Sequence, residues 1–135
     1  MPSKKMAQSM EAIGKKEQYY KMLIESLRLV ASNYDVQMKS FPDFVYVPDE
    51  VALVLNDVLL LNEKSNLIPE KEIISLVELN EKFSEMSKNK NFWTIESFKN
   101  SSEWQESRNL ARDILSGLGF ELETPDLFWL KFVQK

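Results

Sequence analysis

The sequence contains no cysteine and no histidine among its 135 residues. The absence of cysteine excludes disulfide bonds and thiol nucleophiles. The absence of histidine removes the commonest general base, the commonest ligand of transition metals and the usual charge switch near neutral pH. Carboxylate oxygens could still bind calcium or magnesium, but the sequence has no DxDxDG calcium loop. We therefore expect neither a metal ion nor a cofactor.

Glycine, proline and long apolar runs are also scarce. Three glycines and five prolines supply few turns for a many-stranded β fold. The most apolar run, residues 51–61, is interrupted by Asn56 and Asp57 and is far shorter than the roughly 20 residues that span a bilayer. Residues 1–16 lack the apolar segment of a signal peptide. We expect a soluble cytoplasmic protein that does not bind a membrane.

The residues that are present favour one folded domain. Hydrophobic residues make up 44% and charged residues 28% of the chain, which is typical of globular proteins. A chain of this length can bury most of its apolar surface without disulfide bonds. We predict a flexible basic arm over residues 1–14 and a single helical domain over residues 15–135.

Apolar residues recur at helical spacing in four stretches, which predicts four main helices. These helices are expected over residues 15–39, 48–63, 69–87 and 102–116. The second is apolar around almost its whole circumference, so we expect it to be central or buried on two sides. A strand over residues 51–55 is the alternative there, because β-branched residues are frequent, but the length of the stretch favours a helix. In the third, we assign Ile73, Leu76, Val77, Leu79, Phe83 and Met86 to the inner face.

The segments between and after these helices also carry local signals. Pro42 and Pro48 favour an extended Phe-Pro connector over residues 39–49. Thr94 is placed to cap a short helix, and Thr124 followed by Pro125 could begin another, so the C-terminal tail is expected to dock as a short helix or strand. The predicted fold is all-α, with four helices in an antiparallel, bundle-like arrangement, the connector and the docked tail.

The predicted helix over 102–116 carries a tryptophan and two arginines on neighbouring turns. Ser102 and Gln105 have the spacing of a capping box at its start. Trp104, Arg108 and Arg112 follow at intervals of four residues, and these residue types often anchor protein interfaces. The alternative is architectural: Trp104 lies in the core, and Arg108 either extends beside it to solvent or pairs with a carboxylate. We favour the architectural interpretation.

The clearest asymmetry of the sequence is an acidic segment over residues 41–86. Ten acidic residues against three lysines give it a net charge of −7, although the whole chain carries only −4. Apolar residues lie among these acids on the predicted second and third helices, which suggests a surface for a basic protein partner. The residues we assign to this surface are Glu50, Leu53, Asp57, Leu60, Glu63, Glu78, Glu81 and Glu85. The alternative is a solvated face that only keeps the domain soluble.

Other functions have weaker support in the sequence. The carboxylate pairs Asp49/Glu50 and Glu81/Glu85 could exchange protons, but no nucleophile motif or phosphate-binding loop accompanies them, so we expect no enzymatic activity. Residues 1–16 carry a net charge of +3, yet they contain no arginine and the rest of the chain is acidic, so we expect no nucleic-acid binding. The fifteen aromatic residues could line a ligand pocket, but they more often form a core.

Two stretches carry a layout that resembles a known class of proteins. They are FPDFVYVPDEVALVLND and FWTIESFKNSSEWQESRNLARDIL. Over residues 41–116 the chain resembles the small all-helical immunity-type proteins that are encoded beside bacterial polymorphic toxins. The resemblance lies in the order of the elements: a Phe-Pro connector, an apolar helix that begins with acidic residues, a second helix, a short helix at Trp-Thr, and a helix that carries tryptophan and arginine. It implies a non-enzymatic cytoplasmic inhibitor that binds one toxin domain and masks its active site.

The sequence therefore predicts a protein-binding module, an immunity or inhibitor protein that masks a basic partner through an acidic helical face. The alternative is a structural or assembly protein of a phage or another mobile element. The first predicts a stable complex with another protein, whereas the second predicts self-association through an apolar surface. The sequence is compatible with a monomer or a homodimer.

Overall fold

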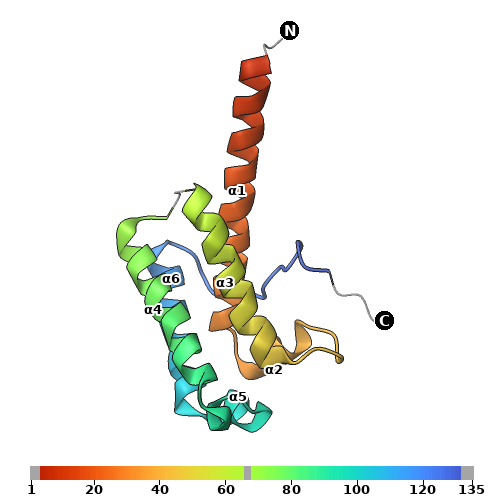
Figure 1. Ribbon diagram of the computed structural model, residues 1–135, viewed down its shortest axis with the longest axis vertical. Coiled ribbons are helices and arrows are strands. Elements are labelled where there is room, and N and C mark those ends of the chain that lie inside the picture. The colour runs from red at the N-terminus through yellow and green to blue at the C-terminus, as the bar shows by residue number, and fades with distance from the viewer. Residues whose placement is uncertain (1–3, 66–67, 132–135) are drawn as a thin grey trace.

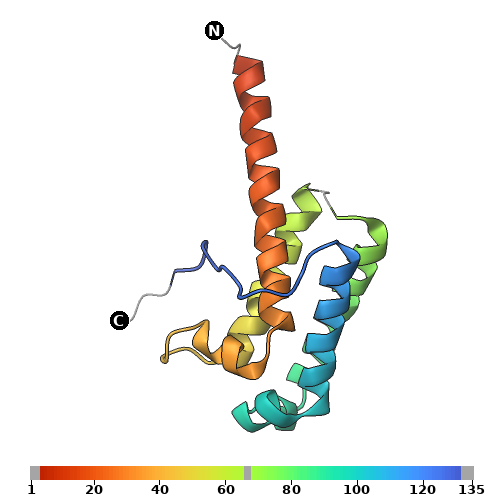
Figure 2. The same cartoon turned by 180° about the vertical axis from the view of Figure 1, so that it is seen from behind.

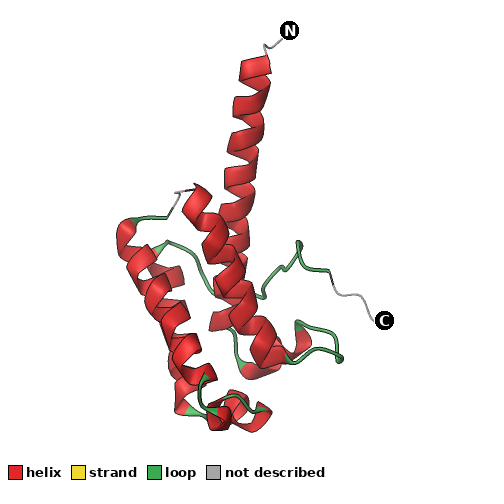
Figure 3. Ribbon diagram, viewed as in Figure 1, coloured by secondary structure: helices red, strands yellow, loops and turns green. Residues whose placement is uncertain are grey.

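The computed structural model describes residues 4–65 and 68–131, and for residues 4–16 and 61–65 it describes the backbone alone. Its helices, in chain order, are α1 (Lys4–Ala31), α2 (Tyr34–Lys39), α3 (Val47–Ser65), α4 (Glu70–Ser87), the 3₁₀ helix η1 (Lys90–Phe92), α5 (Ile95–Asn100) and α6 (Ser102–Gly117). The described residues contain no strand, which confirms the all-helical prediction and excludes a strand over residues 51–55 (Figures 1 and 3). The bundle-like arrangement of four helices stays a prediction.

The central helix of the fold is α1. From Met22 to Ser32 every side chain except that of Arg28 is buried. Helices α3 and α6 flank this part of α1, and the chain after α6 crosses it (Figure 2). We expected the helix over 48–63 to be central or buried on two sides; α3 packs against α1 and α4 and keeps an exposed row on its outer side. The central place of α1 was not visible in its apolar spacing, because α1 buries polar residues whose bonds are made locally: Ser26 Oγ, for example, donates to the carbonyl of Met22 at 2.7 Å.

The single helix predicted over 15–39 is two helices. The break lies at Asn33, whose extended backbone forms the N-cap of α2. The Arg112 guanidinium donates to the carbonyl of Ala31 and to Asn33 Oδ1, both at 2.8 Å, and so satisfies backbone that the end of α1 leaves free. Because Arg112 is 79 residues from Asn33, apolar spacing could not reveal this break.

The N-terminal part of α1 extends beyond the rest of the molecule (Figure 1). Its backbone is helical from Lys4, so residues 4–14 continue α1 without a break. The division of the chain into an arm and a domain stays a prediction. The lysine side chains of residues 1–16 are not among the side chains that the structure describes.

Local signals located the remaining helices well. Thr94 caps α5, accepting a hydrogen bond from the amide of Ser97, as predicted. Helix α6 is capped by Ser101 and not by Ser102, because the hydroxyl of Ser101 accepts from the amide of Trp104. Its C-terminal end is closed by Gly119, whose φ of 87° permits the Phe120 amide to donate to the carbonyl of Leu115 at 3.0 Å.

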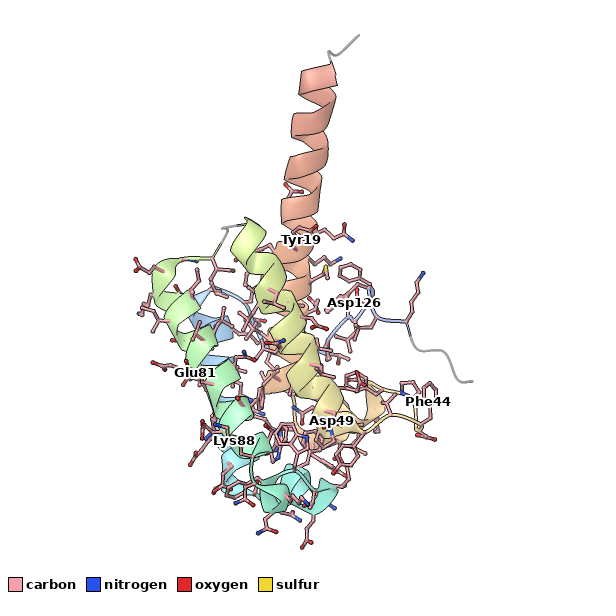
Figure 4. All side chains as sticks on the ribbon, in the orientation of Figure 1. Tyr19, Phe44, Asp49, Glu81, Lys88 and Asp126 are labelled. Carbon is pink, nitrogen blue, oxygen red and sulfur yellow. The ribbon has the colours of Figure 1, made fainter. Side chains whose placement is uncertain are left out.

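The connector before α3 and the C-terminal tail depart from the predicted shapes. Residues 40–46 contain a turn in which the Val45 amide donates to the carbonyl of Pro42, so the connector is not fully extended. Residues 118–131 dock on α1 as predicted, but as irregular chain. The amide of Asp126, which would begin a helix after Pro125, instead donates to Glu25 Oε1 at 2.9 Å (Figure 4).

Candidate functional site: the α3–α4 face

The outer side of α3 carries the apolar and acidic residues that the sequence predicted for it. Leu53 and Leu60 are 51% and 54% exposed, and Asp57 is exposed between them. These three residues lie on one face because their spacings of four and three follow the helical period. Glu50 is half-buried at the first turn of the helix. The side chain of Glu63 lies outside the described residues.

Helix α4 presents both acids and apolar side chains to solvent. Glu78, Glu81 and Glu85 are exposed, as predicted, and Glu81 lies on the outer side of the helix in Figure 4. Ile74 and Val77 are exposed beside them, at 56% and 45%. The assignment of Val77 to the inner face was wrong, because the buried stripe of α4 is narrower and consists of Leu76, Leu79, Phe83 and Met86.

A groove of about 380 Å³ lies between α3 and α4, and we call it the α3–α4 groove. Its lining residues are Asp49, Ala52, Leu53, Asn56, Asn80, Phe83, Ser84, Ser87 and Trp93. Asn80 Nδ2 donates to Asn56 Oδ1 at 3.2 Å, so a polar bridge joins the two helices within it. The sequence analysis missed this groove because its walls come from three segments that only the tertiary structure brings together.

Trp93 closes one end of the α3–α4 groove through two hydrogen bonds. Its indole Nε1 donates to Asp49 Oδ1 at 2.5 Å, and its carbonyl accepts from the Tyr46 hydroxyl at 2.5 Å. The ring itself is half-buried and packs against Trp104, with 5.0 Å between the ring centroids. Trp93 therefore links the connector, the start of α3 and the aromatic core.

The start of α3 is electrostatically strained by its own carboxylates. Burial raises the pKa of Glu50 above its ordinary value, and the negative charges of Asp49 and Asp57 raise it further. Among the described residues, none of these three carboxylates forms an ion pair. The positive end of the α3 dipole favours Asp49 and Glu50, but it contributes only about 0.3–1 kcal/mol at such a site.

The structure brings only part of the predicted acidic surface together. Glu50 interacts electrostatically with Asp57, as their place on one helix requires. In the described part of the chain, no bond joins the acids of α3 to those of α4. Glu85 forms an ion pair at 2.8 Å with Lys88, the residue that follows the end of α4. The surface is therefore two acidic rows with exposed apolar residues and a groove between them, and not one continuous cluster.

The tryptophan and arginine row on α6 is architectural. Trp104 is 1% and Arg108 is 2% exposed. Arg108 Nε donates to Gln37 Oε1 at 3.0 Å, and Nη2 donates to the carbonyl of Phe98 at 2.5 Å. Neither expected form of Arg108 is found, since it is buried and its partners are neutral. Burial, followed by the nearby charge of Arg112, lowers the pKa of Arg108 to about 10.

Aromatic side chains meet in the core, which is the interpretation that we favoured from the sequence, and Phe83 and Trp93 also line the α3–α4 groove. The ring of Trp104 packs edge-on against Phe98, with 4.7 Å between centroids, and lies 5.4 Å from the ring of Phe83. All three side chains are buried. Such contacts contribute about 0.5–1.5 kcal/mol each beyond the area that they bury.

Comparisons with protein families, with curated proteins and with solved structures find no match for this chain. The resemblance to immunity-type proteins therefore rests on the layout of the sequence alone. Within the described ranges, no group of three or more acidic side chains is placed to hold a metal ion. No described helix combines the length and the apolar character needed to cross a bilayer.

Proposed function

We propose that this protein is a non-enzymatic binding module that binds a basic partner protein through the α3–α4 face. One observation supports this most strongly. Of the eight large apolar side chains that are exposed in the described chain, six lie within the segment of net charge −7. These six are Phe44, Tyr46, Leu53, Leu60, Ile74 and Val77. Apolar side chains that gather on a charged face, instead of being scattered singly, are a feature of protein-binding surfaces.

Binding would proceed in two physical stages. The negative field of the face, with Glu78, Glu81 and Glu85 as its outer charges, raises the rate at which a basic protein approaches. Contact then buries Leu53 and Leu60, and the removal of apolar surface from water slows dissociation. Phe44, which is also exposed, projects from the connector, away from the body of the molecule (Figure 4).

The partner class we propose is a toxin domain with a basic active-site cleft, inhibited in the bacterial cytoplasm by an immunity protein. The layout of residues 41–116 supports this choice, and so does the charge, because an acidic face is complementary to a cleft that binds phosphates. In such a complex the inhibitor needs only to cover the cleft, so it needs no catalytic residue of its own.

Affinity capture from host cells, followed by measurement of binding rates with the purified partner, tests the proposal. We expect the double substitution E50K/D57K to lower the association rate at least tenfold at low salt, with a smaller effect at high salt. The double substitution L53A/L60A should chiefly raise the dissociation rate. Asp113, exposed on α6, provides the matched control D113K. Equal association rates for E50K/D57K and D113K would contradict the proposal.

A structural or assembly protein is the second candidate, and the shape of α1 favours it. The first turns of α1 have no neighbouring element in either Figure 1 or Figure 2. A few helical turns that pack against nothing are only marginally stable in water, so packing of these first turns against a second copy would stabilise them. Sedimentation of the full chain at two concentrations separates the candidates, because a mass that rises with concentration supports assembly and a constant monomer mass contradicts it.

A further inference from the structure

The α3–α4 groove has the size of a site for one side chain and its immediate neighbours. Its volume of about 380 Å³ lies near the lower end of the roughly 300–1,000 Å³ that ligand pockets occupy. It opens beside Leu53, which is among the exposed apolar residues of the proposed interface. A partner that buries Leu53 therefore also covers the mouth of the groove.

The groove contains one charge, and nothing in the described chain neutralises it. Asp49 is the only ionisable residue among those that line the groove. One oxygen of its carboxylate accepts from Trp93 Nε1, while no described bond engages the other. Two nearby lysines form ion pairs elsewhere: Lys82 of α4 pairs with Glu106 at 3.1 Å, and Lys88, just after α4, pairs with Glu85.

We infer that the α3–α4 groove binds an arginine side chain of the basic partner. This inference rests on the proposed function and specifies the chemistry of one contact within it. The Asp49 carboxylate would accept hydrogen bonds from the guanidinium, while Ala52, Leu53 and Phe83 supply apolar contacts for the methylene groups of the stem.

Arginine fits this groove better than lysine for two reasons. A guanidinium is planar and weakly hydrated, so it stacks on an aromatic ring at little desolvation cost, and Trp93 offers such a ring at the end of the groove. It also carries five donors in a fixed fork. Asn80 uses its side-chain Nδ2 in the bridge to Asn56 Oδ1, and its side-chain Oδ1 has no described bond. A second acceptor therefore lies in the same groove as Asp49.

The test is a titration of the full, isotope-labelled chain with a blocked tri-arginine peptide, observed at the indole N–H resonance of Trp93. That proton is a direct reporter, because it is donated to Asp49. We expect a saturable shift with tri-arginine, at least fivefold weaker binding with tri-lysine, and no shift with the matched tri-citrulline peptide, which has the same shape without the charge. Equal binding of the citrulline or lysine peptide would overturn the inference.

Substitution of Asp49 sharpens this test. D49N keeps an oxygen that can accept from Trp93, so the fold is retained, but it should weaken arginine binding at least fivefold. D113N makes the same chemical change on the exposed side of α6 and should bind as the unaltered chain does. Unaltered binding by D49N would overturn the inference. If the arginine peptide does not bind while E50K/D57K still slows association with the captured partner, the groove assignment fails and the proposed function stands.

Discussion

The molecule contains two pairs of a tryptophan and a charged residue, and the two pairs have opposite surroundings. Trp104 and Arg108 lie on α6, and both are almost fully buried. Trp93 and Asp49 lie at the end of the α3–α4 groove, where Asp49 is exposed and Trp93 is half-buried. The rings of the two tryptophans are in contact, so the core and the proposed binding surface meet at this point.

The difference between the pairs lies in how each charge is satisfied. Arg108 gives its described hydrogen bonds to neutral groups on two other helices, Gln37 of α2 and the carbonyl of Phe98 of α5. Asp49 accepts one described bond and keeps an oxygen available to a partner. A buried charge must be fully bonded within the fold, whereas an exposed one can be left for another molecule. We therefore expect substitutions to separate stability from binding.

The largest expected effect is on the tryptophans. Trp104→Ala should lower the free energy of unfolding by about 3–5 kcal/mol, because it removes a large buried ring and leaves a cavity. Trp93→Ala should cost about 1–2 kcal/mol, since its ring is only half-buried. Urea denaturation measures both. Equal losses would contradict the separation of core and groove.

Substitution of the charged residues should also lower the free energy of unfolding more in the core than in the groove, but by smaller amounts. Arg108→Ala leaves two buried acceptors without donors and should cost about 3 kcal/mol. Asp49→Ala removes one exposed hydrogen bond and should cost about 1 kcal/mol or less. Denaturation midpoints of the two variants, taken at one pH, provide the comparison. A larger loss for Asp49→Ala would show that the groove carries stability that we assign to the core.

The smallest effect should be a gain in stability at the start of α3. The pKa of Glu50 is raised in the folded state. The folded chain therefore binds more protons than the unfolded chain just above the ordinary pKa of the group, and stability falls as pH rises through this window. Glu50→Gln should stabilise the fold at pH 7 by less than about 1 kcal/mol, because the group is partly exposed.

Thermal unfolding of Glu50→Gln across a pH series measures this effect. The gain should disappear as pH falls below about 4, where the carboxyl is protonated in both states. A gain that is independent of pH would show that its cause is not the ionisation of Glu50, which burial and then the charges of Asp49 and Asp57 disfavour. The predicted gain means that the ionised carboxylate of Glu50 lowers stability, as expected of a residue retained for a partner.

The sequence by itself determined the helical class and most helix boundaries. Apolar spacing located α3, α4 and α6, and short-range chemistry located the cap at Thr94. These features depend on residues only a few positions apart, whose hydrogen bonds form wherever the segment is placed. The acidic character of residues 41–86 was likewise visible in the sequence alone.

Only the tertiary structure decided which helix is central, which partners satisfy Arg108, and how Asp49, Trp93 and Asn80 come to line one groove. Each of these depends on contacts between residues far apart in the chain; Arg108 and Gln37, for example, are separated by 71 residues. Periodicity shows which side of a helix is apolar, but not what covers that side. The choice of partner is set by how the helices pack together, because buried groups must find both volume and hydrogen bonds there.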